Sequence, residues 1–120
     1  MFKIDLHSGK ESGVYSFTGG SDGLAPEAGL IEEDGMLYGT TKSGGTGTCT
    51  GGVGCGVIFK IDPKTGRETV LYQFTGGTDE GNPQAAVIWQ GGSFYGTTAA
   101  NGVNGCGNDE GCGTVFKFTP

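Results

Sequence analysis

GVIFKIDPKTGRETVLYQF, residues 56–74, contains two runs of alternating side chains separated by a turn sequence. Every second residue from Val57 to Ile61 is apolar, and successive side chains of a strand point to opposite faces. The segment Pro63 to Gly66 has the composition of a tight turn. The stretch therefore predicts two antiparallel strands, Gly56 to Asp62 and Thr69 to Phe74.

The same pattern recurs along the chain with a period of 57 residues. Shifting the sequence by that distance aligns residues 2–63 with residues 59–120 without a gap, and 28 of the aligned pairs are identical. FKID occurs at 2–5 and at 59–62, and YGTT occurs at 38–41 and at 95–98. Chance does not produce such a match, so one structural unit is repeated in tandem.

Each repeat is predicted to form four short strands. Ala28 to Glu33 and Met36 to Thr41 form a hairpin around Gly35, and the two strands named above follow it. Four antiparallel strands per repeat are typical of a β-propeller blade, so we expect an all-β chain with about two propeller-type blades. A β-sandwich is the alternative fold, but its strands occupy inequivalent positions and gain nothing from a fixed period.

The predicted organisation is a single repeat array over residues 1–120. It consists of a partial blade (1–14), repeat 1 (15–71) and repeat 2 (72–120). The expected strands number nine: the last two of one blade, four of the next and the first three of another. Repeat units cannot bury their faces alone, so we expect completion by head-to-tail self-association into a ring or a filament.

The amino-acid composition favours an all-β fold and argues against nucleic-acid binding and membrane insertion. Gly supplies 27 of the 120 residues and apolar residues make up only 34%, which suits short strands and turns better than a helical core. The net charge is −6 and no cluster of Lys and Arg occurs, which argues against electrostatic binding of nucleic acid. No apolar run approaches the roughly 18 residues of a membrane helix, so membrane insertion is not expected.

Four long segments of the sequence resemble the GloVer tandem repeat. They are FTGGSDGLAPEAGLIEEDGMLYGTT (17–41), GVIFKIDPKTG (56–66), LYQFTGGTDEGNPQAAVI (71–88), and FYGTTAANG (94–102) with GCGTVFKF (111–118). The resemblance covers essentially the whole chain and implies a propeller-like all-β fold. It also implies an origin in bacterial proteins that are often exported, and an extracellular or cell-surface location. No established activity and no catalytic residues come with it.

The four cysteines occupy the same loop in both repeats, as Cys49 and Cys55 and as Cys106 and Cys112. We expect a disulfide within each loop, which implies an oxidising compartment. A zinc site is the alternative, although zinc pairs are normally two to four residues apart and these pairs are wider. No signal peptide is visible, since Met1 leads straight into strand-like sequence, and this conflicts with the oxidising compartment expected from the cysteines. One resolution is that Met1 begins a trimmed chain.

Two sets of repeated residues are candidates for ligand binding. Asp22 and Asp79 each follow a Gly-Gly pair and either hydrogen-bond their own turn or bind calcium, the one cofactor considered. The candidate ligand surface, for carbohydrate, comprises Tyr38, Thr40, Thr41, Tyr95, Thr97, Thr98 and the unrepeated Trp89. The competing interpretation is that these strands pack blade against blade, with Thr present for its β-propensity.

Nothing in the sequence marks a catalytic site. His7 is the one histidine and falls in a predicted turn, and no Ser/His/Asp or Cys/His arrangement occurs. The unrepeated carboxylates are interpreted as surface charge, namely Glu27, Glu32, Glu33, Asp34, Asp109 and Glu110. We therefore predict a noncatalytic extracellular structural or interaction module. An oligomeric propeller lectin is the alternative, and a propeller glycoside hydrolase or lyase is the third hypothesis.

Overall fold

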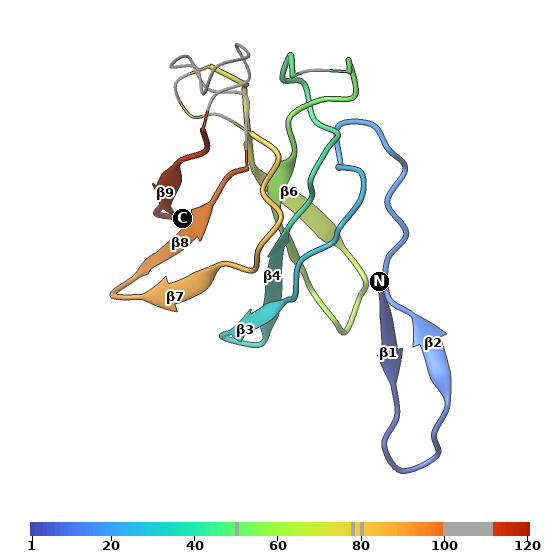
Figure 1. The fold of residues 1–120 in the computed structure, drawn as a ribbon. Helices are drawn as coiled ribbons and strands as arrows, with labels where there is room; N and C mark the ends of the chain where they lie inside the picture. The colour runs from blue at the N-terminus through green and yellow to red at the C-terminus, as the bar shows by residue number, and fades with distance from the viewer. Residues whose placement is uncertain (50, 78, 80, 100–111) are drawn as a thin grey trace.

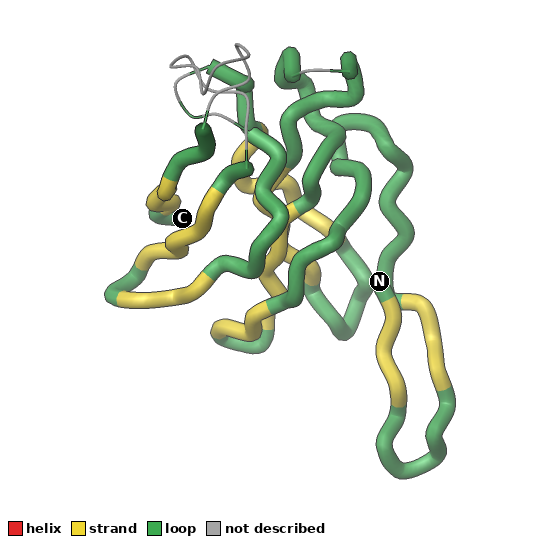
Figure 2. Tube along the Cα trace, viewed as in Figure 1, coloured by secondary structure: helices red, strands yellow, loops and turns green. Residues whose placement is uncertain are grey.

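The computed structural model describes residues 1–49, 51–77, 79, 81–99 and 112–120, and these residues form strands, turns and loops only (Figures 1 and 2). Within those ranges no helix that could cross a membrane is found. The strands of the described part of the chain are β1 (Phe2–Ile4), β2 (Glu11–Gly13), β3 (Ile31–Glu33), β4 (Met36–Thr40), β5 (Val57–Ile61), β6 (Glu68–Gln73), β7 (Ile88–Gln90), β8 (Ser93–Thr97) and β9 (Val115–Phe118).

The strands form three antiparallel sheets of two, four and three strands. The first sheet is β1-β2, the middle sheet is β3-β4-β5-β6 and the third sheet is β7-β8-β9. This division confirms the number and grouping of strands expected from the period. One predicted boundary was wrong, because the strand expected from Ala28 begins only at Ile31, after Gly29 and the exposed Leu30.

The hairpin between β5 and β6 shows how the local sequence sets the register. The N–H of Gly66 donates to the carbonyl oxygen of Asp62 at 2.8 Å, and the Asp62 carboxylate accepts from the Lys64 N–H at 2.8 Å. Gly66 has a φ of +73°, a left-handed conformation that a residue without a Cβ adopts without strain. The turn thus holds Ile61 opposite Glu68 at the start of β6.

A register shift between Ile58 and Phe59 interrupts this hairpin. Because of it Leu71 and Tyr72 pack against the same cluster, whereas Val70 packs against the opposite one. The strict alternation predicted for Thr69 to Phe74 is therefore wrong at this point, since a bulge places two consecutive residues on one side.

Both faces of the middle sheet are covered by the neighbouring repeat segments. On one face, Val57, Phe59 and Ile61 form a buried cluster with residues of the chain that follows β2, including Tyr15 and Phe17. On the other face, Ile58 and Phe74 form a buried cluster with the disulfide and with residues of β6 and β9, namely Leu71, Tyr72, Phe116 and Phe118. The core therefore consists of two interfaces, the first between the middle sheet and the segment that follows β2, and the second between the middle and third sheets.

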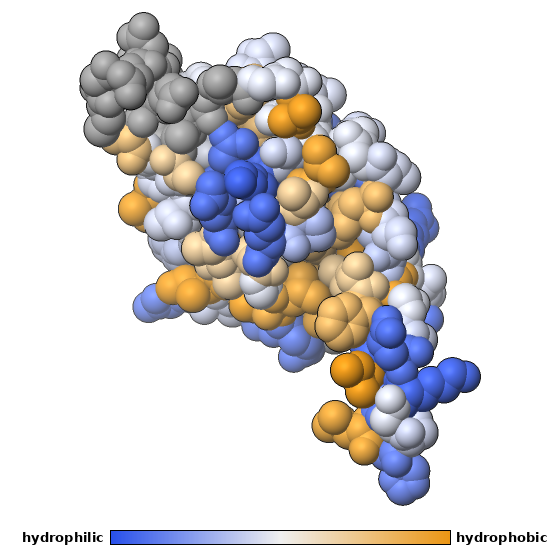
Figure 3. All heavy atoms as spheres, turned by 45° about the vertical axis from the view of Figure 1, so that its right-hand side comes forward, coloured by the Kyte–Doolittle hydropathy of each residue, from blue (hydrophilic) through white to orange (hydrophobic). Residues whose placement is uncertain are grey.

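The first sheet extends away from this core. Figure 1 shows the β1-β2 hairpin projecting from the body, and Figure 3 shows apolar side chains on it beside charged ones. Phe2, Ile4 and Leu6 are 65%, 53% and 97% exposed. At the other end of the array, Val115 and Ile88 of the third sheet are 78% and 59% exposed.

Candidate functional site

Asp22 is held by three hydrogen bonds from residues just before it. Its Oδ2 accepts from the Tyr15 hydroxyl at 2.9 Å and from the Thr18 N–H at 2.8 Å, and its Oδ1 accepts from the Thr18 hydroxyl at 2.7 Å. These donors satisfy the carboxylate. They hold the crossing, which is the segment that leads from one sheet to the next (residues 19–26, and 76–83 in repeat 2), against the end of the preceding strand and the residues just after it. We call this set of three residues the buckle.

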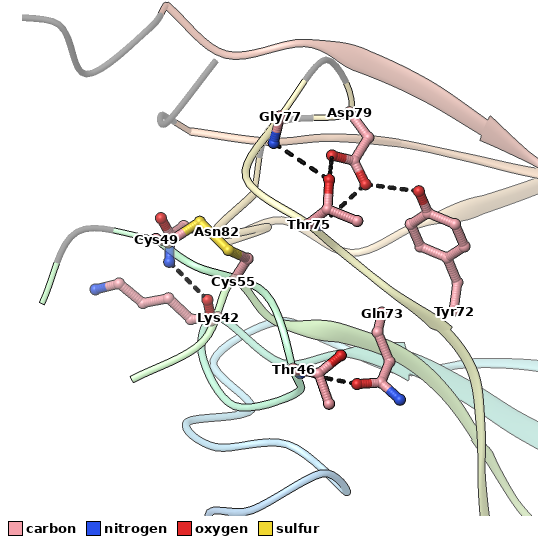
Figure 4. The surroundings of a disulfide bond; sticks show 10 residues. All are labelled: Lys42, Thr46, Cys49, Cys55, Tyr72, Gln73, Thr75, Gly77, Asp79 and Asn82. Carbon is pink, nitrogen blue, oxygen red and sulfur yellow. Dashed lines mark hydrogen bonds between the residues drawn. A yellow bond between two sulfur atoms is a disulfide. The ribbon is translucent and has the colours of Figure 1, made fainter. Parts of the chain in front are cut away.

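Repeat 2 carries the same buckle, shown in Figure 4. Asp79 accepts from the Tyr72 hydroxyl at 2.6 Å, from the Thr75 N–H at 3.0 Å and from the Thr75 hydroxyl at 2.6 Å. Of the two interpretations of the repeated aspartates, this geometry is that of an Asp bonded to its own turn. Among the described residues no group of three or more His, Cys, Asp or Glu side chains is placed to hold a metal ion.

In each buckle the pKa of the aspartate is lowered and the pKa of the tyrosine is raised. Partial burial raises the pKa of Asp22, but the hydrogen bonds from Thr18 and Tyr15 together outweigh it, so the pKa lies below its ordinary value. Asp79 behaves in the same way with Thr75 and Tyr72. Burial and the bond to Asp22 raise the pKa of Tyr15 to about 12, and the bond to Asp79 and burial raise that of Tyr72 to about 12.

Glu68, the first residue of β6, lies in the first interface. Its Oε1 is buried without a hydrogen-bond partner among the described residues. Burial, and after it the negative charge of Asp22, raise the pKa of this carboxyl to about 7. The group therefore takes up a proton near neutral pH, where an exposed glutamate does not.

The cysteine loop of repeat 1 is closed by a disulfide between Cys49 and Cys55 (Figure 4). Both residues are buried, at 8% and 0% exposure, and they pack with Ile58 and Phe74. In repeat 2, Cys112 is disulfide-bonded, and its predicted partner Cys106 lies outside the described residues. Asp109 and Glu110 also lie outside them.

A hydrogen bond between the repeats lies beside the disulfide. The Asn82 side-chain amide donates to the carbonyl oxygen of Lys42 at 2.9 Å, and the Asn82 N–H donates to the carbonyl oxygen of Cys55 at 2.7 Å (Figure 4). Asn82 has a φ of +56°, a conformation that Asn tolerates better than most residues. The disulfide loop thus anchors the crossing into repeat 2.

The residues predicted as a ligand surface do not form one surface. The Tyr38 and Trp89 rings contact Phe94 at 4.5 Å and 4.6 Å between centroids, which places them between the middle and third sheets. Thr40, Thr41 and Thr98 are buried. Tyr95 is half-buried with the Lys117 Nζ 5.9 Å from its ring centre, and Thr97 is exposed.

Two of the buried threonines, Thr41 and Thr98, use their hydroxyl groups in contacts within the fold. Thr41 Oγ1 donates to the carbonyl oxygen of Ser43 at 2.8 Å and accepts from the Val57 N–H at 3.1 Å. Thr98 Oγ1 lies 2.9 Å from Thr114 Oγ1. The glycine of each YGTT motif is equally structural, because a Cβ at Gly39 would lie 2.7 Å from the Phe59 ring. The motif lets the aromatic ring of the neighbouring strand pack over its backbone.

A pocket of about 160 Å³ lies between the middle and third sheets, beside β9. Its walls are mostly aromatic, and its lining includes Ile58, Tyr72, Phe74, Asp79, Phe116 and Phe118. The Phe74 and Phe116 rings meet edge to face at 5.2 Å. The pocket therefore offers an apolar floor next to the second buckle and is a candidate binding site.

A family model for the Gloeobacter/Verrucomicrobia repeat matches residues 1–120. The chain belongs to this repeat family. No curated protein and no solved structure gave a match to the sequence. The GloVer resemblance stated from the motifs is thus confirmed over the full length.

Two features of this GloVer chain were not predicted from its sequence: the hydrogen bonds between the repeated tyrosines and aspartates, and the partial burial of Glu68. Tyr15 and Tyr72 are identical between the repeats, as are Glu11 and Glu68, and these identities were the available signal. The signal did not show that the tyrosines bind the repeated aspartates, or that Glu68 is half-buried while Glu11 is exposed. His7, the one histidine, is exposed in the β1-β2 turn.

Proposed function

We propose that this chain is a noncatalytic extracellular structural and interaction module, built from propeller-type blades, that associates head to tail with copies of itself. One observation carries the proposal. The middle sheet buries both faces against its neighbours, and the outward faces of the first and third sheets expose the same kinds of side chain.

The two exposed faces match the two buried faces of the middle sheet, residue by residue. Phe2 occupies the repeat position of Phe59, which is fully buried, whereas Phe2 is 65% exposed. Val115 occupies the position of Ile58, which is 1% exposed, whereas Val115 is 78% exposed. Burial of these side chains favours association, at roughly 25 cal/mol per Å² of apolar surface.

Such an interface joins two different surfaces, so it is heterologous. The third sheet of one copy would receive the first sheet of the next, as the middle sheet receives its neighbours within the chain. An interface of this type produces a ring when the rotation closes and a filament when it does not.

Two further observations support a structural and extracellular role. The repeated acidic residues Asp22 and Asp79 each accept three hydrogen bonds within the fold. This structural role explains why both repeats contain the aspartate, without a catalytic role for it. The Cys49–Cys55 disulfide suits an oxidising compartment outside the cytoplasm.

The experiment measures the native mass of the non-reduced protein by light scattering over a range of concentrations, with negative-stain imaging. We expect rings or filaments for the wild type. Phe2→Glu and Val115→Glu should each reduce assembly, because each places a charge in one half of the interface. Both side chains are exposed in the single chain, so urea unfolding should show that the variants remain folded.

Mixing the two variants tests whether the interface is heterologous. Each retains one intact face, so an equimolar mixture should form dimers and stop there. Gln84→Glu, at an exposed position outside the strands, is the matched control and should assemble like the wild type. A wild type that is monomeric at every concentration, or a mixture that forms no dimer, would show the proposal to be wrong.

A further inference from the structure

The crossing of repeat 2 lies directly on the Cys49–Cys55 disulfide. A Cβ at Gly76 would lie 2.8 Å from Cys49 Sγ, and a Cβ at Gly81 would lie 2.9 Å from the same sulfur atom. Neither position has room for a side chain, so the backbone itself covers the sulfur atoms. In line with this contact, Cys55 is fully buried and Cys49 is only 8% exposed.

Hydrogen bonds fasten this crossing at two places. Near its start, the second buckle ties Asp79 back to the residues that precede the crossing (Figure 4). Further along, the Asn82 N–H donates to the carbonyl oxygen of Cys55 at 2.7 Å. Gly76 lies in sequence within the buckle, and Gly81 lies between the buckle and Asn82. Both glycines that cover the disulfide are therefore held in place by these bonds.

The crossing of repeat 1 has the same buckle but a different surrounding. Gly19 occupies the repeat position of Gly76, and a Cβ there would meet only the Leu24 side chain, at 3.7 Å. Asp22 nevertheless accepts the same three hydrogen bonds as Asp79. The chain thus contains one buckle beside a covered disulfide and one equivalent buckle whose glycine lies away from the sulfur atoms.

Reduction of a disulfide requires direct access to one of its sulfur atoms. A thiolate of a dithiol attacks that sulfur, the S–S bond breaks as a mixed disulfide forms, and the other cysteine leaves as a thiolate. The second thiol of the reagent then displaces the first cysteine and closes a disulfide within the reagent. The dithiol is oxidised, the protein disulfide is reduced, and the two cysteine thiolates take up the protons that the dithiol has lost.

We propose that the Cys49–Cys55 disulfide is a gated site of thiol–disulfide exchange with dithiols, and that the crossing of repeat 2 is its gate. While the crossing is fastened, the backbone at Gly76 and Gly81 occupies the space that an attacking thiolate needs. When the crossing opens locally, exchange proceeds although the sheets remain folded. Local opening requires less free energy than global unfolding, so the opening of the crossing sets the rate of reduction.

The gate protects the covalent bond that anchors the crossing between the repeats. All the contacts that form it lie within one chain. The inference therefore goes beyond the proposed association of copies and does not depend on it.

The test measures how fast dithiothreitol reduces this disulfide in the folded, initially oxidised chain at neutral pH without denaturant. Samples taken at intervals are treated with iodoacetamide, which blocks the thiols formed, and are then digested with trypsin. Cleavage after Lys42 and Lys60 gives a peptide of residues 43–60, which contains Cys49 and Cys55 and no other cysteine. Mass spectrometry of this peptide gives the rate.

Asp79→Ala unfastens the gate, and Asp22→Ala is the matched control. Asp79→Ala should be reduced about tenfold faster than the wild type, because its crossing loses three hydrogen bonds to a charged carboxylate. Asp22→Ala loses the equivalent bonds in repeat 1 and should be reduced at the rate of the wild type. Urea unfolding of the oxidised variants gives the global stabilities for comparison with these rates.

Gly81→Ala tests the cover without altering the buckle. Its methyl group would lie 2.9 Å from Cys49 Sγ and 2.8 Å from Cys55 Cβ, so the crossing cannot close fully and reduction should again be faster than in the wild type. Gly29→Ala is the control for this change and should leave the rate unaltered, because its Cβ would meet only Ala86, at 3.9 Å.

Two results would overturn the gate. Equal acceleration in Asp79→Ala and Asp22→Ala would mean that reduction follows global unfolding, since the two variants share only a loss of overall stability. Rates for Asp79→Ala and Gly81→Ala equal to that of the wild type would mean that dithiothreitol reaches the sulfur atoms with the crossing closed. Light scattering of Phe2→Glu and Val115→Glu tests association separately, so either proposal can fail without the other.

Discussion

The Tyr72 hydroxyl donates a hydrogen bond of 2.6 Å to Asp79 Oδ2, and Tyr15 makes the same bond to Asp22 at 2.9 Å one period earlier. Each bond joins the strand end of one repeat unit to the crossing that leads to the next. The repeated Tyr and Asp are therefore a structural pair, and they set the path of the chain between sheets.

Replacing Asp79 by Ala should lower the free energy of unfolding by about 1–3 kcal/mol. The substitution removes three hydrogen bonds to a charged carboxylate, from the partly buried Tyr72 hydroxyl and from the exposed N–H and hydroxyl of Thr75. Hydrogen bonds to a charged group contribute more to stability than neutral ones. Urea unfolding followed by tyrosine and tryptophan fluorescence measures the change.

Asp22→Ala is the matched variant, because Asp22 accepts the equivalent three bonds in repeat 1. It should lose a similar amount. Gln84→Ala, at an exposed position, should unfold like the wild type. If neither Asp variant differs from Gln84→Ala, the buckle contributes nothing to stability.

The glycines of the two YGTT motifs give a second prediction. A Cβ at Gly39 would lie 2.7 Å from both the Phe59 ring and the Leu30 side chain, and Phe59 is fully buried. Gly39→Ala should therefore destabilise the protein by about 1–3 kcal/mol, as overpacking of a core does. Thermal unfolding by circular dichroism provides the measurement.

Gly96→Ala is the internal comparison for Gly39→Ala. Its Cβ would meet the Phe116 ring just as closely, but Phe116 is half-buried beside the pocket and can move. We expect a smaller loss of stability at this position. Equal losses in the two variants would mean that Phe116 is held as rigidly as Phe59.

The period of 57 residues was enough to predict most of the fold. The grouping of strands into two, four and three follows from where the repeat register falls on the chain, because each strand pattern recurs at a fixed place. The bulge at Ile58 and Phe59 could not be predicted in this way. The bulge depends on how residues of β5 and β6 pack into the two apolar clusters on opposite faces of the middle sheet. These contacts form only when the sheets pack together, so the local sequence does not show them.

The candidate site was predicted less well than the fold. Repetition identified Asp22 and Asp79 but did not identify their partners, since Tyr15 and Tyr72 also look like ordinary strand residues. Thr41 was proposed as a ligand contact because its hydroxyl is polar. Its actual role, bridging Ser43 and the Val57 N–H, depends on the loop path, which the residue pattern does not encode.

Loss of the Cys49–Cys55 disulfide should cost about 2 kcal/mol of unfolding free energy, the value expected for closing a short loop. The double variant Cys49→Ala/Cys55→Ala measures it, because alanine keeps the positions apolar in a buried cluster. Chemical unfolding with and without reductant is the readout. A double variant as stable as the oxidised wild type would show that the bond is dispensable.

The raised pKa of Glu68 makes stability depend on pH. Burial and the charge of Asp22 raise the pKa from an ordinary value of 4.5 to about 7 in the folded chain. The folded state therefore holds this proton more tightly than the unfolded state. Its stabilising contribution is complete below about pH 4.5 and is lost as the pH rises through about 7. The lowered pKa values of Asp22 and Asp79 act in the opposite sense, at acid pH.

Glu68→Gln removes the titrating group and preserves the size of the side chain. Between about pH 4.5 and about pH 7, the unfolding free energy of the wild type should fall more steeply than that of the Gln variant. Above about pH 7 the Gln variant should be the more stable protein, because it places no charge in the buried site beside Asp22. Urea unfolding at a series of pH values gives both curves.

Glu11→Gln, at the equivalent but exposed position of β2, is the control and should keep the pH dependence of the wild type. If Glu68→Gln keeps it as well, another group titrates in this range and Glu68 is ionised in the folded protein. If only Glu68→Gln flattens the curve, the proton is located at the first interface. Mildly acidic conditions then strengthen the contact between the middle sheet and the segment that carries Asp22.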